Sequence, residues 1–140
     1  MGQTVIIFLD ANVIIYQVEG VEPFQCQVLT ALREVVQQYA EFSFAVSRLS
    51  TLECLVKPVR ERDNAVIDRY HGFFTATDLK IVEVTSEVLE TAILLRAHHG
   101  LRTPDAIQAA SALSLKKPVI FLTGDRSFKN VPGLEVRLIN

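Results

Sequence analysis

Four acidic side chains stand at positions where carboxylates could act together on one ligand. Asp10 directly follows the apolar run VIIFL, and Glu53 closes the segment SRLSTLE. Asp105 follows a Thr-Pro pair in GLRTPDAIQAA, and Asp125 follows the run VIFLT within FLTGDRSF. Two unit charges about 4 Å apart repel by about 4 kcal/mol at an effective dielectric of about 20. If the four acids converge, their cluster must therefore take up protons or bind a cation.

Such a cluster would offer only hard oxygen ligands. No His, Cys or Lys stands at a matching position to make a thiolate site or an internal salt bridge. Carboxylate ligands favour Mg²⁺ or Mn²⁺, and Ca²⁺ is disfavoured because the sequence contains no EF-hand loop. Such ions polarise a phosphodiester, lower the pKa of a bound water and stabilise the leaving oxygen. Phosphoryl chemistry is therefore the predicted use of the cluster.

Each acid also has an ordinary structural explanation when it is taken alone. Asp10 and Asp125 fit turn positions, where aspartate accepts hydrogen bonds from nearby backbone. Glu53 fits a solvated helix face. Asp105 fits the first turn of a helix, where a negative charge complements the helix dipole by about 0.3–1 kcal/mol. The functional interpretation therefore depends on the joint placement of the four.

Alternating apolar runs and helical patterns predict the elements that must position these acids. Strands are predicted over residues 5–9, 42–46, 80–84, 119–123 and 135–139. Helices are predicted over residues 23–40, 49–56, 59–74 and 86–98, and after Gly100. We expect Pro58 to stop the second helix, Ser86 to cap the fourth, and Thr103 to cap the last, with Pro104 as its first residue.

This alternation predicts an α/β protein with one domain over residues 1–140. Its fold class is a three-layer α/β/α arrangement with a central, mostly parallel sheet of four to five strands. In open α/β sheets, ligands bind beyond the carboxyl ends of the strands, near a switch in strand order. We therefore expect all four acids at one end of the sheet.

Composition narrows the class of protein. The 140 residues are 49% hydrophobic and 21% charged, which is typical of a soluble globular domain. No apolar stretch approaches the about 20 residues of a membrane span, so no membrane association is expected. A net charge of −2 argues against a generally basic nucleic-acid binder but allows local recognition. Cys26 and Cys54 form no metal-binding pattern, and we interpret them as reduced thiols of a cytoplasmic protein.

The four acidic segments resemble those of the PIN-domain ribonucleases, and specifically toxins of the VapC type. The carriers are FLDANVII, SRLSTLE, GLRTPDAIQAA and FLTGDRSF, in that order and spanning nearly the whole chain. The resemblance implies a PIN-like parallel sheet between helices and a Mg²⁺- or Mn²⁺-dependent endoribonuclease. It also implies a homodimer that acts on RNA and is silenced by a small antitoxin protein.

Residue roles follow from the resemblance by position. Asp10, Glu53, Asp105 and Asp125 would be the catalytic and metal-binding acids. Asn12 would orient Asp10 or a metal-bound water, and Thr123 would support the site by hydrogen bonding. Under this hypothesis an activated water attacks phosphorus in line with the departing 3′ oxygen. Four nearby cations could hold the RNA backbone and fit solvated loop positions equally well: Arg48, Arg102, Arg126 and Lys129.

Two alternatives stand beside this hypothesis. Receiver and haloacid-dehalogenase domains also place an aspartate after a strand, where it accepts phosphate. The dehalogenase pattern requires a second acid where Asn12 stands, and a receiver requires a Lys after a late strand, whereas Lys116 and Lys117 precede one. The other alternative is a non-catalytic binding or scaffold module of the same PIN-like fold, with the acids present but unused.

Overall fold

A five-stranded parallel sheet forms the centre of the protein, seen here in a computed structural model that describes residues 3–140. The strand order is β3-β2-β1-β4-β5, and every neighbouring pair is parallel. The predicted sheet is therefore confirmed, with Met1 and Gly2 outside the described residues. The strands are β1 (Thr4–Leu9), β2 (Glu41–Ser47), β3 (Leu79–Val82), β4 (Val119–Thr123) and β5 (Val136–Leu138).

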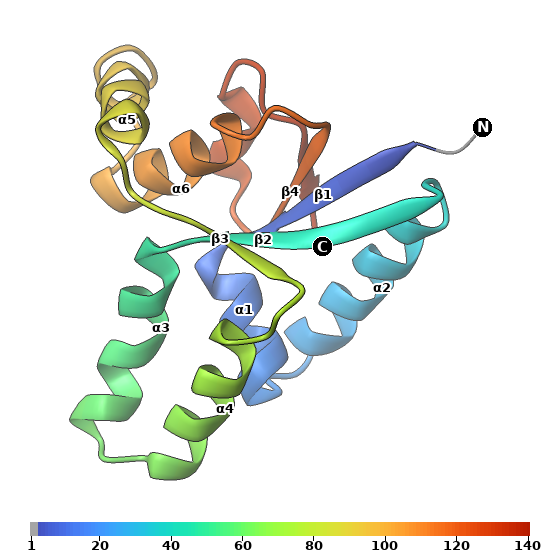
Figure 1. Cartoon of the computed structure of the whole chain (residues 1–140), viewed down its shortest axis with the longest axis vertical. Coiled ribbons are helices and arrows are strands. Elements are labelled where there is room, and N and C mark those ends of the chain that lie inside the picture. The colour runs from blue at the N-terminus through green and yellow to red at the C-terminus, as the bar shows by residue number, and fades with distance from the viewer. Residues whose placement is uncertain (1–2) are drawn as a thin grey trace.

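Helices cover both faces of the sheet, which makes the three predicted layers (Figure 1). One face carries α1 (Ala11–Glu19), α2 (Phe24–Val36), α3 (Leu49–Arg60) and α4 (Asn64–Phe74). The other face carries α5 (Ser86–His99), α6 (Thr103–Leu113) and the short 3-10 helix η1 (Arg126–Asn130). The predicted α/β/α architecture is confirmed.

The apolar run in β1 reflects its position between two hydrophobic cores. Val5 and Ile7 are fully buried in the core that contains α1 to α4. Ile6 and Phe8 point to the opposite core, where Phe8 stacks on Phe121 of β4 with ring centroids 5.5 Å apart. Because successive side chains of a strand point to opposite faces, a strand covered on both sides is apolar throughout.

The structure adds α1, a helix absent from the predicted elements. Its β-branched residues Val13 and Ile14 are typical of a strand, yet both are 1% exposed inside the helical core. The ends of the helix determine its conformation: Asp10 accepts a hydrogen bond from the Ala11 N–H, and Gly20 adopts the left-handed conformation at φ 70°. Capping and burial together outweigh the strand preference of the apolar run.

The expectation that Pro58 ends its helix is wrong. Helix α3 continues to Arg60, and Pro58 lies buried in its last turn. The Asp63 N–H donates a 2.9 Å hydrogen bond to the Pro58 carbonyl, which satisfies one of the final acceptors of the helix. Asp63 then caps α4, which begins at Asn64 instead of Val59.

Two predicted caps are shifted by one residue. Thr85, rather than Ser86, caps α5 by accepting a 3.2 Å hydrogen bond from the Val88 N–H. Helix α6 begins at Thr103, so Arg102 occupies the N-cap position and makes no side-chain cap bond. Both caps therefore lie one residue earlier than predicted, which is within the ordinary uncertainty of helix boundaries.

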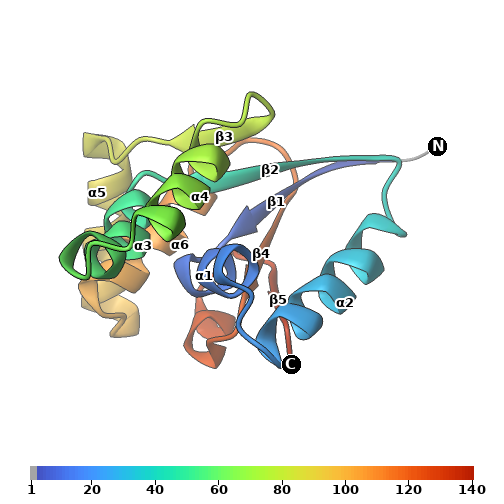
Figure 2. The same cartoon turned by 90° about the horizontal axis from the view of Figure 1, so that it is seen from below.

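Polar contacts connect α1 to α4 and connect α2 to the edge strand β5. The Tyr70 hydroxyl of α4 donates to the Glu19 carboxylate at the end of α1, while its ring is completely buried. Arg137 of β5 forms an ion pair with Glu34 of α2, and β5 lies beside that helix in Figure 2. Within residues 3–140, no helix is long and apolar enough to cross a membrane.

Candidate active site

Asp10 lies at the point where the strand order reverses. It directly follows β1, the central strand, whose neighbours β2 and β4 belong to the two halves of the chain. Its Oδ1 accepts a 2.8 Å hydrogen bond from the Ala11 N–H, and its Oδ2 accepts one of 2.7 Å from the Thr123 hydroxyl. With 6% of its surface exposed, the Asp10 carboxylate is both buried and fixed in orientation.

The surroundings of Asp10 raise its pKa from 3.8 to about 6. Burial is the largest cause, because removal from water penalises the charged form. The hydrogen bonds from Thr123 and Ala11 act in the opposite direction, and the negative charges of Asp105 and Glu53 raise the pKa further. The structure therefore brings three of the four predicted acids into electrostatic contact.

Glu53 reaches the site from the second turn of α3. The Gln108 side-chain amide of α6 donates a 2.9 Å hydrogen bond from Nε2 to Glu53 Oε1. The same Nε2 donates a 2.9 Å hydrogen bond to the hydroxyl of Ser50, one turn before Glu53 on α3. Gln108 and Ser50 are almost completely buried, so a polar contact inside the protein connects α3 to α6 beside the acid.

Asp105 reaches the site from the first turn of α6, and its side chain is 18% exposed. Its Oδ2 pairs with the Arg102 guanidinium, with a distance of 3.3 Å to Nε. The sequence did not predict this ion pair. Arg102 therefore supplies part of the positive charge that a metal ion would otherwise bring to Asp105.

Asp125 has a different local role. Its carboxylate caps η1 by accepting a 2.9 Å hydrogen bond from the Ser127 N–H. Its own backbone N–H donates a 3.0 Å hydrogen bond to the hydroxyl of Thr123. The neighbouring charges that raise the pKa of Asp10 are those of Asp105 and Glu53. Thr123 thus connects the two acids, because its hydroxyl donates to Asp10 and accepts from the Asp125 N–H. Asp125 itself lies in the loop that follows β4.

Asn12 lies in the first turn of α1, two residues after Asp10. Its Oδ1 is buried, and no donor among residues 3–140 reaches it. An amide oxygen cannot donate to a carboxylate, and the hydrogen bonds to Asp10 come from Ala11 and Thr123 instead of Asn12. A buried acceptor without a partner costs about 1–3 kcal/mol, so Asn12 Oδ1 is available to accept a hydrogen bond from a bound water or ligand.

The acids do not form a closed cage in this conformation. Within the described residues 3–140, no group of three or more His, Cys, Asp or Glu side chains is placed to hold a metal ion. The four-acid cluster that the sequence predicts is thus incomplete: three acids influence one another, and Asp125 is engaged in a helix cap.

The PIN domain family matches residues 7–134, which is most of the chain. The chain belongs to the PIN-domain family. No curated protein matches the sequence. The membership excludes the receiver and haloacid-dehalogenase alternatives, both of which are other families. It also gives this PIN domain a documented fold with which its strand order and its helices can be compared.

Solved structures share the fold of this PIN domain across nearly its full length. One similar chain comes from the structure of VapBC2 from Rickettsia felis, which is bound to a DNA fragment from the VapBC2 promoter. It is 15% identical to this chain, with a TM-score of 0.73. That match covers 95% of this chain and 98% of the other. A chain from a toxin-antitoxin complex of Klebsiella pneumoniae is 19% identical with a TM-score of 0.68, covering 95% and 97%. VapBC-1 of nontypeable Haemophilus influenzae gives 15% identity and a TM-score of 0.64, covering 96% and 98%.

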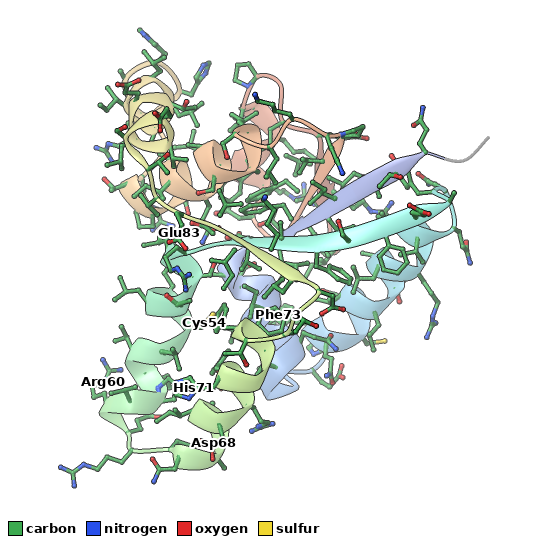
Figure 3. The ribbon with its side chains drawn as sticks, in the orientation of Figure 1. Cys54, Arg60, Asp68, His71, Phe73 and Glu83 are labelled. Carbon is green, nitrogen blue, oxygen red and sulfur yellow. The ribbon has the colours of Figure 1, made fainter. Side chains whose placement is uncertain are left out.

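The cations predicted to contact RNA differ in how they are held in this PIN domain. Arg48 makes a bidentate pair with Glu83, with a shortest distance of 2.7 Å, beside the start of α3 (Figure 3). Arg102 pairs with Asp105, as described above. Arg126 and Lys129 are exposed on η1, whose Phe128 is buried against Phe121. Two of the four cations are therefore already engaged with carboxylates.

Sequence reasoning missed Gln108 and the small hydroxyl residues around it. The Ser111 and Ser47 hydroxyls lie 3.1 Å apart, one turn further along α6 from the contact between Gln108 and Ser50. A signal was present: Gln108 and Ser111 follow Asp105 at successive spacings of three on a helix whose other inward residues are alanines. Polar residues at that spacing on an apolar face indicate a buried polar contact.

The residues present fit a divalent cation by their chemistry. Asp10, Glu53 and Asp105 supply hard oxygen donors. Burial is the main cause of the raised pKa of Asp10, and the charges of Asp105 and Glu53 add to it. Asn12 adds a buried oxygen without a partner in the described chain. The fit requires rearrangement, because no three of the acids within residues 3–140 are placed to hold an ion and because Asp105 must exchange its contact with Arg102 for the ion.

Proposed function

We propose that this PIN domain is a Mg²⁺- or Mn²⁺-dependent endoribonuclease that hydrolyses RNA phosphodiester bonds, as the toxin of a toxin–antitoxin pair. The observation that carries the proposal is the buried Asp10 carboxylate, which Ala11 and Thr123 hold at the end of the central strand. The charges of Asp105 and Glu53 act on this carboxylate. A protein that keeps a buried carboxylate beside two others gains nothing for stability. A cation-dependent reaction explains why the three stand together.

The metal would be held by Asp10, Glu53 and Asp105, with Asp125 as the fourth candidate. When bound, the ion would polarise the phosphodiester and lower the pKa of a bound water. The chain's own residues do the remaining work. Thr123 and Ala11 hold the Asp10 carboxylate in one orientation through both of its oxygens. Preorganised ligands of this kind avoid reorganisation during the reaction.

Arg102 gives the site a way to respond to its ligands. Its guanidinium pairs with Asp105 while its side chain remains 81% exposed, so the contact can break without disturbing the core. When a cation replaces Arg102 at Asp105, the guanidinium becomes free to contact a phosphate oxygen of RNA. Arginine suits this role because its planar fork can bind two phosphate oxygens at once.

Substitution of the buried acid tests the proposal. We expect Asp10→Asn to abolish Mn²⁺-dependent cleavage of a mixed-sequence RNA while the variant keeps its cooperative unfolding transition. Glu22→Gln, which changes an exposed acid before α2, is the matched control and should cleave like the wild type. Undiminished cleavage by Asp10→Asn would refute the proposal.

One observation favours a second function, that of a non-catalytic binding module. Residues 3–140 contain no closed group of metal ligands, and Asp105 is neutralised by Arg102. An unused acidic cluster would show no stabilisation by metal. Titration of the metal-free protein with Mn²⁺ during thermal unfolding separates the two functions, because a ligand that binds only the folded state raises stability by about 2.7 kcal/mol at a hundredfold excess over Kd.

The partners belong to the same proposal. A small antitoxin is supported by the toxin–antitoxin complexes in which the similar folds occur. A homodimer is supported by exposed apolar side chains on α5, where Ile93 is 64% exposed and Leu94 57% exposed. Sedimentation equilibrium of the purified chain tests the dimer, and a monomer at micromolar concentration would refute it. RNA as the substrate and the cytoplasm as the location remain predictions from the sequence.

A further inference from the structure

Gln108 is a buried polar residue whose side-chain hydrogen bonds, among residues 3–140, go to the candidate metal ligand Glu53 and to Ser50 on the same helix. It is 1% exposed in the second turn of α6, whose other buried residues are alanines and Ser111. Its Nε2 donates to Glu53 Oε1 and to Ser50 Oγ, both at 2.9 Å. These two acceptors lie one turn apart on α3, so the amide contacts a single face of that helix.

The chemistry of the two acceptors fixes the orientation of the amide. A carboxylate only accepts hydrogen bonds, so the Gln108 atom facing Glu53 must be the nitrogen. The Gln108 oxygen then points elsewhere, and Oε1 is buried without a donor among the described residues. The Gln108 amide therefore donates to Glu53, while its own oxygen accepts no hydrogen bond from the described residues. An apolar side chain of similar length would fill the space without that cost.

One face of helix α6 therefore presents both the acid Asp105 and the Gln108 amide that bonds Glu53. Asp105 and Gln108 are three residues apart, so their side chains project from the same side of the helix. Asp105 acts electrostatically on Asp10, while Gln108 holds the acid that approaches from α3. The position of Glu53 relative to Asp105 is thereby set by α6 itself.

We propose that Gln108 is a positioning residue that orients the Glu53 carboxylate for binding the divalent cation. This inference rests on the proposed function. A donor to one carboxylate oxygen limits rotation of the carboxylate and leaves the other oxygen, Oε2, available for the ion. Partners of this kind are worth about ten- to hundredfold in metal affinity.

Titration of metal-free, full-length protein with Mn²⁺ at pH 7, followed by calorimetry, tests the proposal without relying on activity. We expect Gln108→Met to weaken Mn²⁺ affinity by about ten- to hundredfold. Ser111→Ala is the matched control, because it removes another buried contact of α6, with Ser47, that touches no acid. We expect this control to bind Mn²⁺ as the wild type does.

A double-variant cycle separates positioning from general packing. If Gln108 acts through Glu53, then adding Gln108→Met to Glu53→Gln weakens Mn²⁺ binding no further. An equal loss in both backgrounds would overturn the proposal, as would wild-type affinity in Gln108→Met. Should Gln108→Met fail to fold, Gln108→Asn takes its place, since it keeps a polar amide but is too short for the contact.

The outcomes for the inference and for the proposed function differ. If the wild type binds Mn²⁺ and Asp10→Asn does not, while Gln108→Met binds normally, the positioning role is wrong and the proposed metal site stands. If the wild type itself binds no Mn²⁺, the proposed function is wrong and the role of Gln108 with it.

Discussion

The Thr123 hydroxyl donates a 2.7 Å hydrogen bond to the Asp10 carboxylate, across 113 positions of the sequence. The same oxygen accepts a 3.0 Å hydrogen bond from the Asp125 N–H. One hydroxyl therefore connects the end of β1, the end of β4 and the loop that follows. Because its hydrogen bond lowers the pKa of Asp10 against the effect of burial, Thr123 keeps that acid ionised at neutral pH.

Removal of this hydroxyl should raise the pKa of Asp10 above its value of about 6. Thr123→Val keeps the shape of the side chain but deletes the donor, so the charged carboxylate loses one of its two stabilising contacts. We also expect a loss of about 1–3 kcal/mol in the free energy of unfolding at pH 8, where Asp10 is ionised. Carbon-detected NMR titration and urea unfolding measure the two effects.

Thr30→Val is the control for Thr123→Val. Its exposed hydroxyl bonds the Cys26 carbonyl on α2, away from the acids. This control should leave the pKa of Asp10 unchanged. An unchanged pKa in Thr123→Val as well would show that the hydrogen bond does not tune the acid.

Stability should fall as pH rises from about 4 to about 6 because of Asp10. Its folded pKa of about 6 lies above the ordinary value of 3.8, so in this window the folded state binds the proton and the unfolded state does not. A folded state that binds more protons loses stability with increasing pH. The shift of about two pKa units corresponds to roughly 3 kcal/mol as an upper limit.

Urea unfolding of wild type and Asp10→Asn at pH 4, 5, 6 and 7, without metal, isolates this contribution. Acids that do not interact with Asp10 contribute equally to both proteins, so the difference between them reports Asp10 and its interactions with Asp105 and Glu53. We expect the free energy of unfolding of the wild type to decrease relative to the variant up to pH 6 and to remain parallel above it. A difference independent of pH would mean that Asp10 titrates normally.

Arg102→Ala should strengthen Mn²⁺ binding. The guanidinium competes for Asp105 in the metal-free protein, and its removal frees that carboxylate. Exposed ion pairs contribute about 0–1 kcal/mol, so the gain in affinity should reach about fivefold at most. Isothermal titration measures it, with Arg126→Ala on η1 as the matched change of charge. Weaker binding in Arg102→Ala would show that Arg102 supports the metal site instead of competing with it.

The two cysteines should differ sharply toward thiol reagents. Cys26 is exposed, whereas Cys54 is 2% exposed on the inner side of α3, where its sulfur lies 3.9 Å from the Ala11 carbonyl oxygen (Figure 3). Burial raises the pKa of the Cys54 thiol, and the charges of Glu53, Glu19 and Asp10 raise it further. Thiolate is the reactive form, so Cys54 should remain unmodified.

Reaction with Ellman's reagent at pH 8 measures this difference. The native protein should release one equivalent quickly, and the protein in urea should release two, because the chain contains two cysteines. Cys26→Ser, as control, should react only after unfolding. Two rapid equivalents from the native protein would show that α3 opens frequently beside the site.

Much of the fold was predictable because the central strands β1 and β4 are buried on both faces. The run Val119–Thr123 was predicted with its observed ends, since a continuous apolar strand is distinct from amphipathic helices. Helix α1 and the extension of α3 past Pro58 were not predictable from local pattern. Both depend on tertiary packing, which buries Val13 and Pro58 and outweighs the local preferences of those residues.

The sequence indicates where the acids of the candidate site fall and anticipates a hydrogen bond from Thr123, but it does not indicate the other polar contacts. Asp10 and Asp105 stand at element boundaries that the sequence marks clearly. The contacts of Arg102 with Asp105 and of Gln108 with Glu53 depend on side-chain conformations and on the packing of α3 against α6. Neither is encoded by spacing alone, and both decide how the acids are held.

The central position of β1 has a consequence for synthesis on the ribosome. Asp10 is translated early, yet its partners come from α3, α6 and β4, the last of which ends at Thr123. A nascent chain therefore lacks the complete arrangement until most of it has left the exit tunnel. Premature termination before β4 yields a polypeptide in which the carboxylates are not assembled, so the arrangement forms only in the nearly complete chain.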